Sequence, residues 1–164
     1  VILLADVSGS MGVDGKIQAL NYAVREMLDA FKEESDLRAE VHVSVITFGG
    51  IAQVHTALSP ANDVSWTDVG AGGGTPMGAA FDLVRQLVDD RDVVSGRAYR
   101  PTIVLVSDGQ PTDTWQQPLQ GLLESERGGK AFRMALAIGA DADTDVLQAF
   151  LDHRRDQRVV VGDL

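Results

Sequence analysis

Two short apolar runs, each followed closely by an aspartate, most constrain the fold of this chain. Residues 1–5 form a continuous apolar run that ends at Asp6, and residues 102–106 form a second run that is followed by Ser107 and Asp108. A run without polar alternation is typical of a strand that is buried on both faces, as in a parallel sheet covered by helices. The two runs therefore predict strands in the interior of an α/β domain.

The remaining segments alternate between helical and strand periodicity, apart from one hairpin. Gly49 and Gly50 separate two extended stretches, which predicts an antiparallel pair. The expected strands are 1–5, 41–48, 51–57, 102–106, 132–138 and 158–161, and the expected helices are 16–32, 76–88, 114–126 and 144–152. This order predicts a Rossmann-like, doubly wound α/β fold with a mostly parallel six-stranded sheet, one antiparallel edge strand and helices on both faces.

Length and composition fit one globular domain that spans residues 1–164. Hydrophobic residues make up 45% of the 164 residues and charged residues 23%, and no internal repeat or interdomain linker is evident. The chain begins at Val1 inside an apolar run, without an initiator Met, so we expect a trimmed piece of a longer protein. No apolar run approaches the roughly 20 residues of a membrane helix, so we expect no membrane insertion.

Charge and cysteine content exclude several kinds of partner and chemistry. Lys and Arg number 14 against 24 Asp and Glu, which gives a formal net charge of −10. Such a surface repels phosphate backbones and anionic membranes, so we expect no nucleic-acid partner. The lack of cysteine removes disulfides, thiol catalysis and thiolate metal sites, and it favours a cytoplasmic location. The oligomeric state stays open.

Oxygen-bearing side chains gather in three loops that we expect at the carboxyl ends of strands, where open α/β sheets bind ligands. These side chains belong to Asp6, Ser8, Ser10, Thr75 and Asp108. The first three are spaced by two residues, so a tight turn can direct them into one cavity. Oxygen-only ligands suit a hard cation, and Mg²⁺ commonly takes one or two carboxylates and keeps several waters. The five residues therefore predict a site for Mg²⁺, with Mn²⁺ or Ca²⁺ as alternatives.

Simpler explanations exist for each residue taken alone, since Asp and Ser are common in turns and helix caps. The joint occurrence of all five in this context favours a metal site. Asp113 could serve the metal's outer shell or a partner, but a cap on the next helix is the favoured role. Trp66 and Trp115 are expected to pack rather than to recognise a partner. The glycine-rich run lacks the pattern of a dinucleotide loop, because position 75 is Thr.

The motifs resemble those of the von Willebrand factor A domains, whose metal-ion-dependent adhesion site (MIDAS) has the pattern D-x-S-x-S, then T, then D. The resemblance spans nearly the whole chain, because every element falls in the family's order. It implies that Ser8, Ser10 and sometimes Thr75 coordinate the metal directly, while Asp6 and Asp108 often act through water. It further implies a protein partner that contributes a Glu or Asp to the metal.

Three segments, residues 44–48, 73–76 and 108–115, most resemble the bacterial branch of this family that is associated with tellurium-resistance and stress-response operons. This finer resemblance implies a cytoplasmic scaffold that works beside other stress proteins, and not a secreted adhesin. We therefore expect a binding module and not an enzyme.

A Mg²⁺-dependent phosphohydrolase of the haloacid dehalogenase type is the main alternative, with Asp6 as its nucleophile. Such enzymes use D-x-D, and here Ser8 replaces the second Asp, which leaves no suitable general acid. We also expect no lysine near the Asp108 loop to stabilise a transferring phosphoryl group. A third hypothesis, a structural module with an empty vestigial site, predicts no stabilisation by Mg²⁺ or Mn²⁺.

Overall fold

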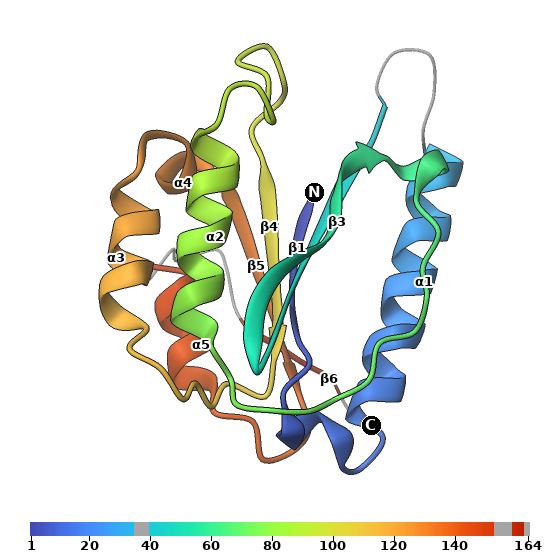
Figure 1. The fold of residues 1–164 in the computed structure, drawn as a ribbon, viewed down its shortest axis with the longest axis vertical. Coiled ribbons are helices and arrows are strands. Elements are labelled where there is room, and N and C mark those ends of the chain that lie inside the picture. The colour runs from blue at the N-terminus through green and yellow to red at the C-terminus, as the bar shows by residue number, and fades with distance from the viewer. Residues whose placement is uncertain (35–39, 153–158, 163–164) are drawn as a thin grey trace.

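The computed structural model describes residues 1–34, 40–152 and 159–162. Six strands form one sheet in the order β3-β2-β1-β4-β5-β6 (Figure 1). The strands are β1 (Ile2–Asp6), β2 (His42–Gly49), β3 (Ile51–Pro60), β4 (Thr102–Ser107), β5 (Phe132–Ile138) and β6 (Val160–Gly162). All neighbours pair in parallel except β2 and β3, which form the antiparallel hairpin at one edge. The predicted fold class is confirmed.

Helices cover both faces of the sheet, as Figure 1 shows: α2, α3, α4 and α5 lie on one face and α1 on the other. The helices are α1 (Lys16–Glu34), α2 (Met77–Asp89), α3 (Gln116–Glu124), α4 (Glu126–Lys130) and α5 (Thr144–Phe150), with short 3₁₀ turns η1 (Gly9–Gly12) and η2 (Ala61–Asp63). Each face has its own hydrophobic core cluster. Within the described ranges, no helix is long and apolar enough to cross a membrane.

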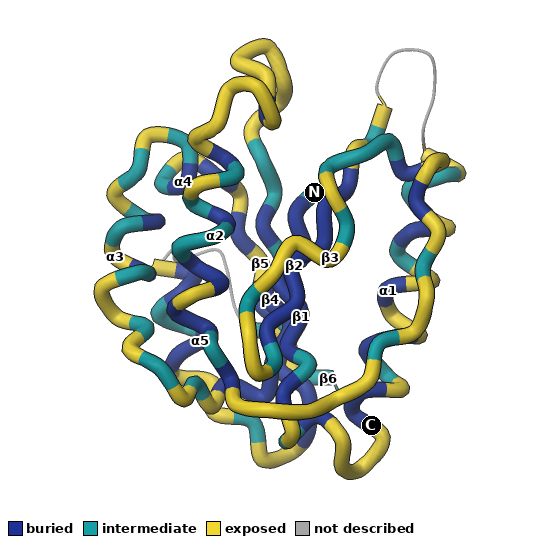
Figure 2. The backbone as a smooth tube through the Cα atoms, in the orientation of Figure 1, coloured by how far each residue is buried: buried dark blue, intermediate teal, exposed yellow. Residues whose placement is uncertain are grey.

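β1 lies in the middle of the sheet and is buried along its length, as Figure 2 shows. Its successive side chains enter opposite cores: Leu4 packs in the cluster under α2, and Leu3 packs in the cluster under α1. This explains why the run carries no polar alternation. In the register of β1 against β4, Ala5 pairs with Val106, so Asp6 and the residue after Val106 end their strands side by side.

One predicted helix, residues 114–126, begins later in the structure, at Gln116, and is interrupted at Ser125. α3 ends at Glu124, and Ser125 adopts an extended conformation that starts α4. The Ser125 hydroxyl accepts a hydrogen bond from the backbone N–H of Gly128 at 3.0 Å. A serine in this role favours a helix start over a helix interior, which explains the break.

The ends of several other elements also differ from the prediction. β3 continues to Pro60 and not only to residue 57, and α1 continues to Glu34 and not only to residue 32. The predicted helix 144–152 ends at Phe150 in α5. Position 158, where the last strand was predicted to begin, lies outside the described residues, and β6 is described from Val160. Helix ends commonly shift by one or two residues, because terminal turns depend on local capping.

We expect Phe81→Ala to lower the free energy of unfolding by about 3–5 kcal/mol, because the ring is fully buried in α2 and leaves a cavity. The ring also stacks on Phe150, with centroids 5.8 Å apart and an interplanar angle of 5°. Urea denaturation measures the loss. As a control, Tyr99→Ala should change stability by no more than roughly 0.5 kcal/mol, because that side chain is 89% exposed. Equal losses in both variants would contradict this account of the core.

Candidate metal centre

The carboxylate of Asp6 is the hub of the loops at the carboxyl ends of β1 and β4. Its Oδ1 accepts hydrogen bonds from the backbone N–H of Ser8 at 2.9 Å and from the Ser8 hydroxyl at 2.6 Å. Its Oδ2 accepts a hydrogen bond from the hydroxyl of Ser107 at 2.6 Å. Asp6 itself is fully buried. The carboxylate therefore ties the first loop to the end of the neighbouring strand.

The turn η1 presents the second hydroxyl of the D-x-S-x-S segment. The Oγ atoms of Ser8 and Ser10 lie 3.1 Å apart. Met11 is fully buried beneath the turn, and its backbone N–H donates to the carbonyl of Ser8 at 3.0 Å. Asp6, Ser8 and Ser10 are thus joined by a chain of direct hydrogen bonds.

The glycine-rich loop is held against the first loop by backbone hydrogen bonds. The N–H of Gly9 donates to the carbonyl of Gly73, and the N–H of Gly50 donates to the carbonyl of Gly74, each at 2.9 Å. Gly73 has a φ of +77°, and a Cβ there would lie 2.6 Å from the backbone of Gly50. A side chain at position 73 would push the loops apart, so this glycine allows the approach that brings Thr75 to the same edge.

Thr75 is also fastened to the loop that follows β4. Its backbone N–H donates to the hydroxyl of Thr112 at 2.8 Å, and its carbonyl accepts from the backbone N–H of Thr112 at 2.9 Å. Asp113 accepts hydrogen bonds from the backbone N–H groups of Gly78 and Ala79 at 2.9 and 3.0 Å. Asp113 is a helix cap, as predicted, but on α2 and not on the following helix, because the loop folds back over the α2 N-terminus.

Asp108 is buried and only partly satisfied by its neighbours. Among the described residues, its Oδ1 has no hydrogen-bond partner. Its Oδ2 lies 3.9 Å from the Nζ of Lys16, the first residue of α1. The expectation that no lysine lies near the Asp108 loop is therefore wrong. Lys16 is distant in sequence, and only the packing of α1 on the sheet brings it there.

The two carboxylates stand in an unfavourable electrostatic environment. Burial raises the pKa of Asp6, and the negative charge of Asp108 raises it further, while hydrogen bonds from Ser107 and Ser8 oppose the shift. A cation between or beside the carboxylates would relieve this repulsion. The partnerless Asp108 Oδ1 and the paired serine hydroxyls add oxygen donors for a hard ion. The residues present thus fit a divalent metal.

Different contacts hold the five predicted ligands in place. Asp6, Ser8 and Ser10 are joined by direct hydrogen bonds, and Asp108 is close enough to act on the charge of Asp6. Thr75 is 3% exposed and is carried to this edge by the loop contacts. Within the described residues, no group of three or more His, Asp or Glu side chains is placed to hold a metal. The candidate centre therefore depends on hydroxyl ligands, and metal binding by these five residues stays a prediction.

Two contributing residues, Ser107 and Lys16, were not predicted as part of the site. Ser107 directly follows the apolar run 102–106, and a polar side chain at that position indicates a hydrogen-bonding role at the end of the strand. Lys16 lies four residues before Leu20 and therefore on the buried face of α1. A charged residue on the buried face of a helix indicates a buried partner of opposite charge, and this pattern could have drawn attention to Lys16.

Both tryptophans pack, as predicted. The Nε1 of Trp66 donates to the side-chain oxygen of Asn21 on α1 at 3.1 Å, and the ring packs against the core under α1. Trp115 packs against the opposite core. Asn21 also accepts from the backbone N–H of Val69, so this residue anchors the long loop that leads to Thr75.

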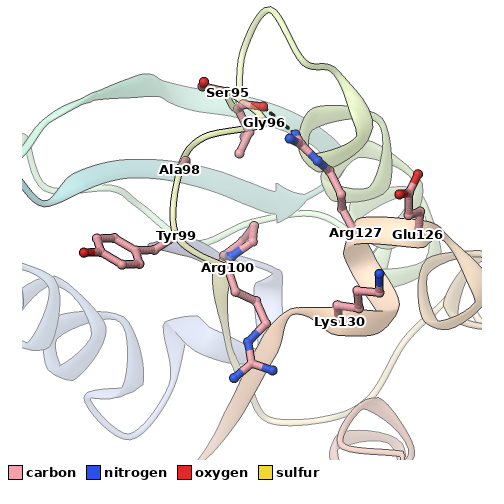
Figure 3. A pocket seen from close by; sticks show the side chains of 10 residues that line it. Ser95, Gly96, Ala98, Tyr99, Arg100, Glu126, Arg127 and Lys130 are labelled. Carbon is pink, nitrogen blue, oxygen red and sulfur yellow. Dashed lines mark hydrogen bonds between the residues drawn. The ribbon is translucent and has the colours of Figure 1, made fainter.

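A separate pocket, drawn in Figure 3, is lined by residues just before the start of β4, and Figure 1 shows this segment at the opposite end of the sheet from the loops described above. Its lining includes Tyr99, Arg100, Arg127 and Lys130. The guanidinium of Arg127 already donates to the carbonyls of Val88 and Val94, so it is committed to holding the local backbone. The pocket is therefore a weaker candidate for a ligand site than the strand-end loops, where Asp108 Oδ1 has no partner among the described residues.

Comparison with known families agrees with the fold and with the order of the loops. The family model of the von Willebrand factor type A domain matches residues 1–110, a span that contains all five candidate ligands. The class is an open α/β domain that carries its loops at the carboxyl ends of a mostly parallel sheet. The chain belongs to the von Willebrand factor type A domain family.

Individual relatives are more distant. An uncharacterized protein of Mycobacterium tuberculosis is 29% identical over 157 residues, which cover 90% of this chain but 23% of that protein. The manganese-loaded TRAP protein of Plasmodium vivax has a TM-score of 0.72 at 18% identity, with 99% of this chain and 67% of that chain covered. Mussel byssus proximal thread matrix protein 1, with a zinc-occupied MIDAS motif, has a TM-score of 0.71 at 18% identity, with coverages of 98% and 43%.

We expect Asp6→Asn to change how the stability of the metal-free protein depends on pH. Because the folded state raises the pKa of Asp6, it binds that proton more tightly than the unfolded chain does. The contribution of Asp6 to the free energy of unfolding is therefore largest below the unfolded pKa and declines as pH rises through the folded pKa. Asn cannot ionise, so the variant should gain stability relative to the wild type as pH rises from roughly 4 to 7.

Urea unfolding with a chelator at several pH values measures this difference. Asp29→Asn is the matched control, because it makes the same chemical change at an exposed position in the interior of α1, away from the helix ends. Its stability relative to the wild type should vary little with pH. A difference for Asp6→Asn that is flat or falls with pH would show that burial does not control this carboxyl.

Proposed function

We propose that this chain is a divalent-metal-dependent protein-binding module. Asp6, Ser8, Ser10, Thr75 and Asp108 would hold Mg²⁺, with Mn²⁺ or Ca²⁺ as alternatives, and the metal would accept a Glu or Asp side chain from a protein partner. The observation that carries the proposal is the buried, partnerless Oδ1 of Asp108 beside the hydrogen-bonded group of Asp6, Ser8 and Ser10.

The hydrogen-bond pattern suits hydroxyl ligation. The Ser8 hydroxyl donates its proton to Asp6, so its oxygen can only accept in the contact with the Ser10 hydroxyl, and one lone pair stays available. Asp6 already accepts three hydrogen bonds, and this favours a role in orienting Ser8 over direct contact with the metal. A bound cation held largely by neutral hydroxyls would stay electrophilic and would supply an open position for a partner's carboxylate.

Two structurally similar proteins support a divalent metal in this fold. One is a manganese-loaded TRAP protein, and the other is proximal thread matrix protein 1 with a zinc-occupied MIDAS motif. Both are similar to this chain over nearly its full length. They support a divalent metal here, and the all-oxygen donor set of this chain favours a hard ion such as Mg²⁺ over Zn²⁺.

The finer assignment takes residues 1–164 as one domain of a cytoplasmic bacterial scaffold associated with tellurium resistance and stress response. It is supported by the resemblance of segments 44–48, 73–76 and 108–115 to that branch. Segment 73–76 contains Thr75 and segment 108–115 contains Asp108, Thr112 and Asp113. The resemblance therefore falls on residues that shape the candidate metal centre.

We expect Mg²⁺ or Mn²⁺ to stabilise the protein and the double substitution Ser8→Ala, Ser10→Ala to abolish the effect. Binding to the folded state alone adds about 2.7 kcal/mol to the free energy of unfolding when free metal is about 100 times its Kd. Thermal unfolding with metal and with chelator measures the shift. Ser59→Ala is the control, because its hydroxyl donates to the carbonyl of Ala57 where β3 pairs with the start of β2, and it should keep the full shift. No shift in the wild type would instead support a vestigial site.

Phosphohydrolysis is the second candidate function, because Lys16 lies beside Asp108 where a phosphoryl group could be stabilised. Two features oppose it: Ser8 stands in place of a general acid, and hydrogen bonds at both carboxylate oxygens hold Asp6 away from nucleophilic attack. We expect no turnover of para-nitrophenyl phosphate with Mg²⁺. Turnover that is lost in Asp6→Asn would establish the enzyme and overturn the binding function.

A further inference from the structure

The side chain of Lys16 places a fixed positive charge inside the candidate metal centre. Lys16 is 2% exposed, which is rare for a lysine unless it is paired. Its Nζ lies 3.9 Å from Asp108 Oδ2 and 3.2 Å from Asp141 Oδ1. Asp141 belongs to the loop after β5, and its side chain is 74% exposed. The ammonium therefore bridges a buried candidate ligand and a solvent-exposed carboxylate.

The Lys16 side chain packs against a glycine in the loop after β5. Gly139, the first residue after β5, has a φ of +93°, and a Cβ there would lie 2.7 Å from Lys16 Cε and 3.2 Å from its Nζ. A side chain at position 139 would displace the ammonium from its place beside Asp108. The position of Lys16 is thus determined by the packing of α1, the loop after β5 and Asp108 together.

A charge balance shows what the ammonium does to the centre. Asp6 and Asp108 bring two negative charges, and Lys16 brings one positive charge at close range. Asp141 also pairs with the ammonium at 3.2 Å, and the hydrogen bond from Lys16 lowers its pKa, but the exposed Asp141 carboxylate acts on the buried centre through water, which weakens its effect there. A divalent cation would therefore find one negative charge to neutralise instead of two, and the loaded centre would keep one surplus positive charge.

We infer that Lys16 changes two affinities of the centre in opposite directions. It weakens binding of the bare metal, and it strengthens binding of a carboxylate to the metal-loaded protein. This inference rests on the proposed function and goes beyond it. The surplus charge is neutralised by one carboxylate, so metal and acidic partner side chain bind best together. A purely structural lysine would change stability but would alter neither affinity in this opposed way.

The test compares the wild type with Lys16→Met, which keeps an unbranched side chain as far as Cε and removes the charged amino group. Calorimetric titration with Mn²⁺ alone should show a Kd roughly tenfold lower in the variant, because the repulsion is gone. Lys130→Met is the matched control. It loses the same charge from an exposed position at the end of α4, beside the far end of the sheet, and its Kd should stay within about twofold of the wild type.

Acetate serves as the carboxylate probe. Its affinity for each Mn²⁺-loaded protein is measured from the paramagnetic relaxation of the methyl protons. We expect Lys16→Met to bind acetate at least about threefold more weakly than the wild type, although it binds the metal more tightly. If Lys16→Met does not fold, as judged by circular dichroism, Lys16→Gln replaces it, because the amide can still donate to Asp108 and Asp141.

The outcomes separate the two proposals. Failure of the wild type to bind Mn²⁺ would overturn the proposed function, and this inference with it. Metal binding that is unchanged or weaker in Lys16→Met would overturn the inference alone, and so would unchanged or tighter acetate binding. Tighter metal binding together with weaker acetate binding would support it.

Discussion

The buried carboxylate of Asp6 is the interaction on which the candidate centre depends. It accepts hydrogen bonds from Ser8 in its own loop and from Ser107 at the end of the adjacent strand. Burying a carboxylate is costly, and the cost is reduced only when hydrogen bonds or a cation compensate it. The hydrogen bonds from Ser8 and Ser107 offset part of this cost. Asp108 adds a second buried negative charge, and the uncompensated repulsion between the two carboxylates favours a cation beside them.

The sheet topology makes this meeting of carboxylates possible. β1 and β4 are parallel neighbours, so their carboxyl ends, with Asp6 and Asp108, lie at the same edge. The glycine-rich loop then crosses that edge, held by backbone hydrogen bonds at Gly73 and Gly74. Burial in the strands gives this arrangement a rigid base, and Ser10 is the one candidate ligand of the five that is not fully buried.

Lys16 changes how the centre should be understood. Two carboxylates and three hydroxyls alone would describe a site built only to attract a cation. With an ammonium 3.9 Å from Asp108, a metal-loaded centre would instead keep a surplus positive charge. Because Lys16 could also stabilise a phosphoryl group, phosphohydrolysis needs a direct test. Because Ser8 stands where a phosphohydrolase would have its general acid, binding is the better supported function.

The sequence by itself determined the strands, most of the helices and the residue types at the strand ends, because these follow from local periodicity and from motif spacing. It also determined the antiparallel hairpin, through Gly49 and Gly50. Only the tertiary structure decided that Asp113 caps α2, that Ser107 donates to Asp6 and that Lys16 reaches Asp108. These contacts join residues 35 to 101 positions apart, and no local pattern encodes which distant side chains the packing of helices on a sheet will bring together.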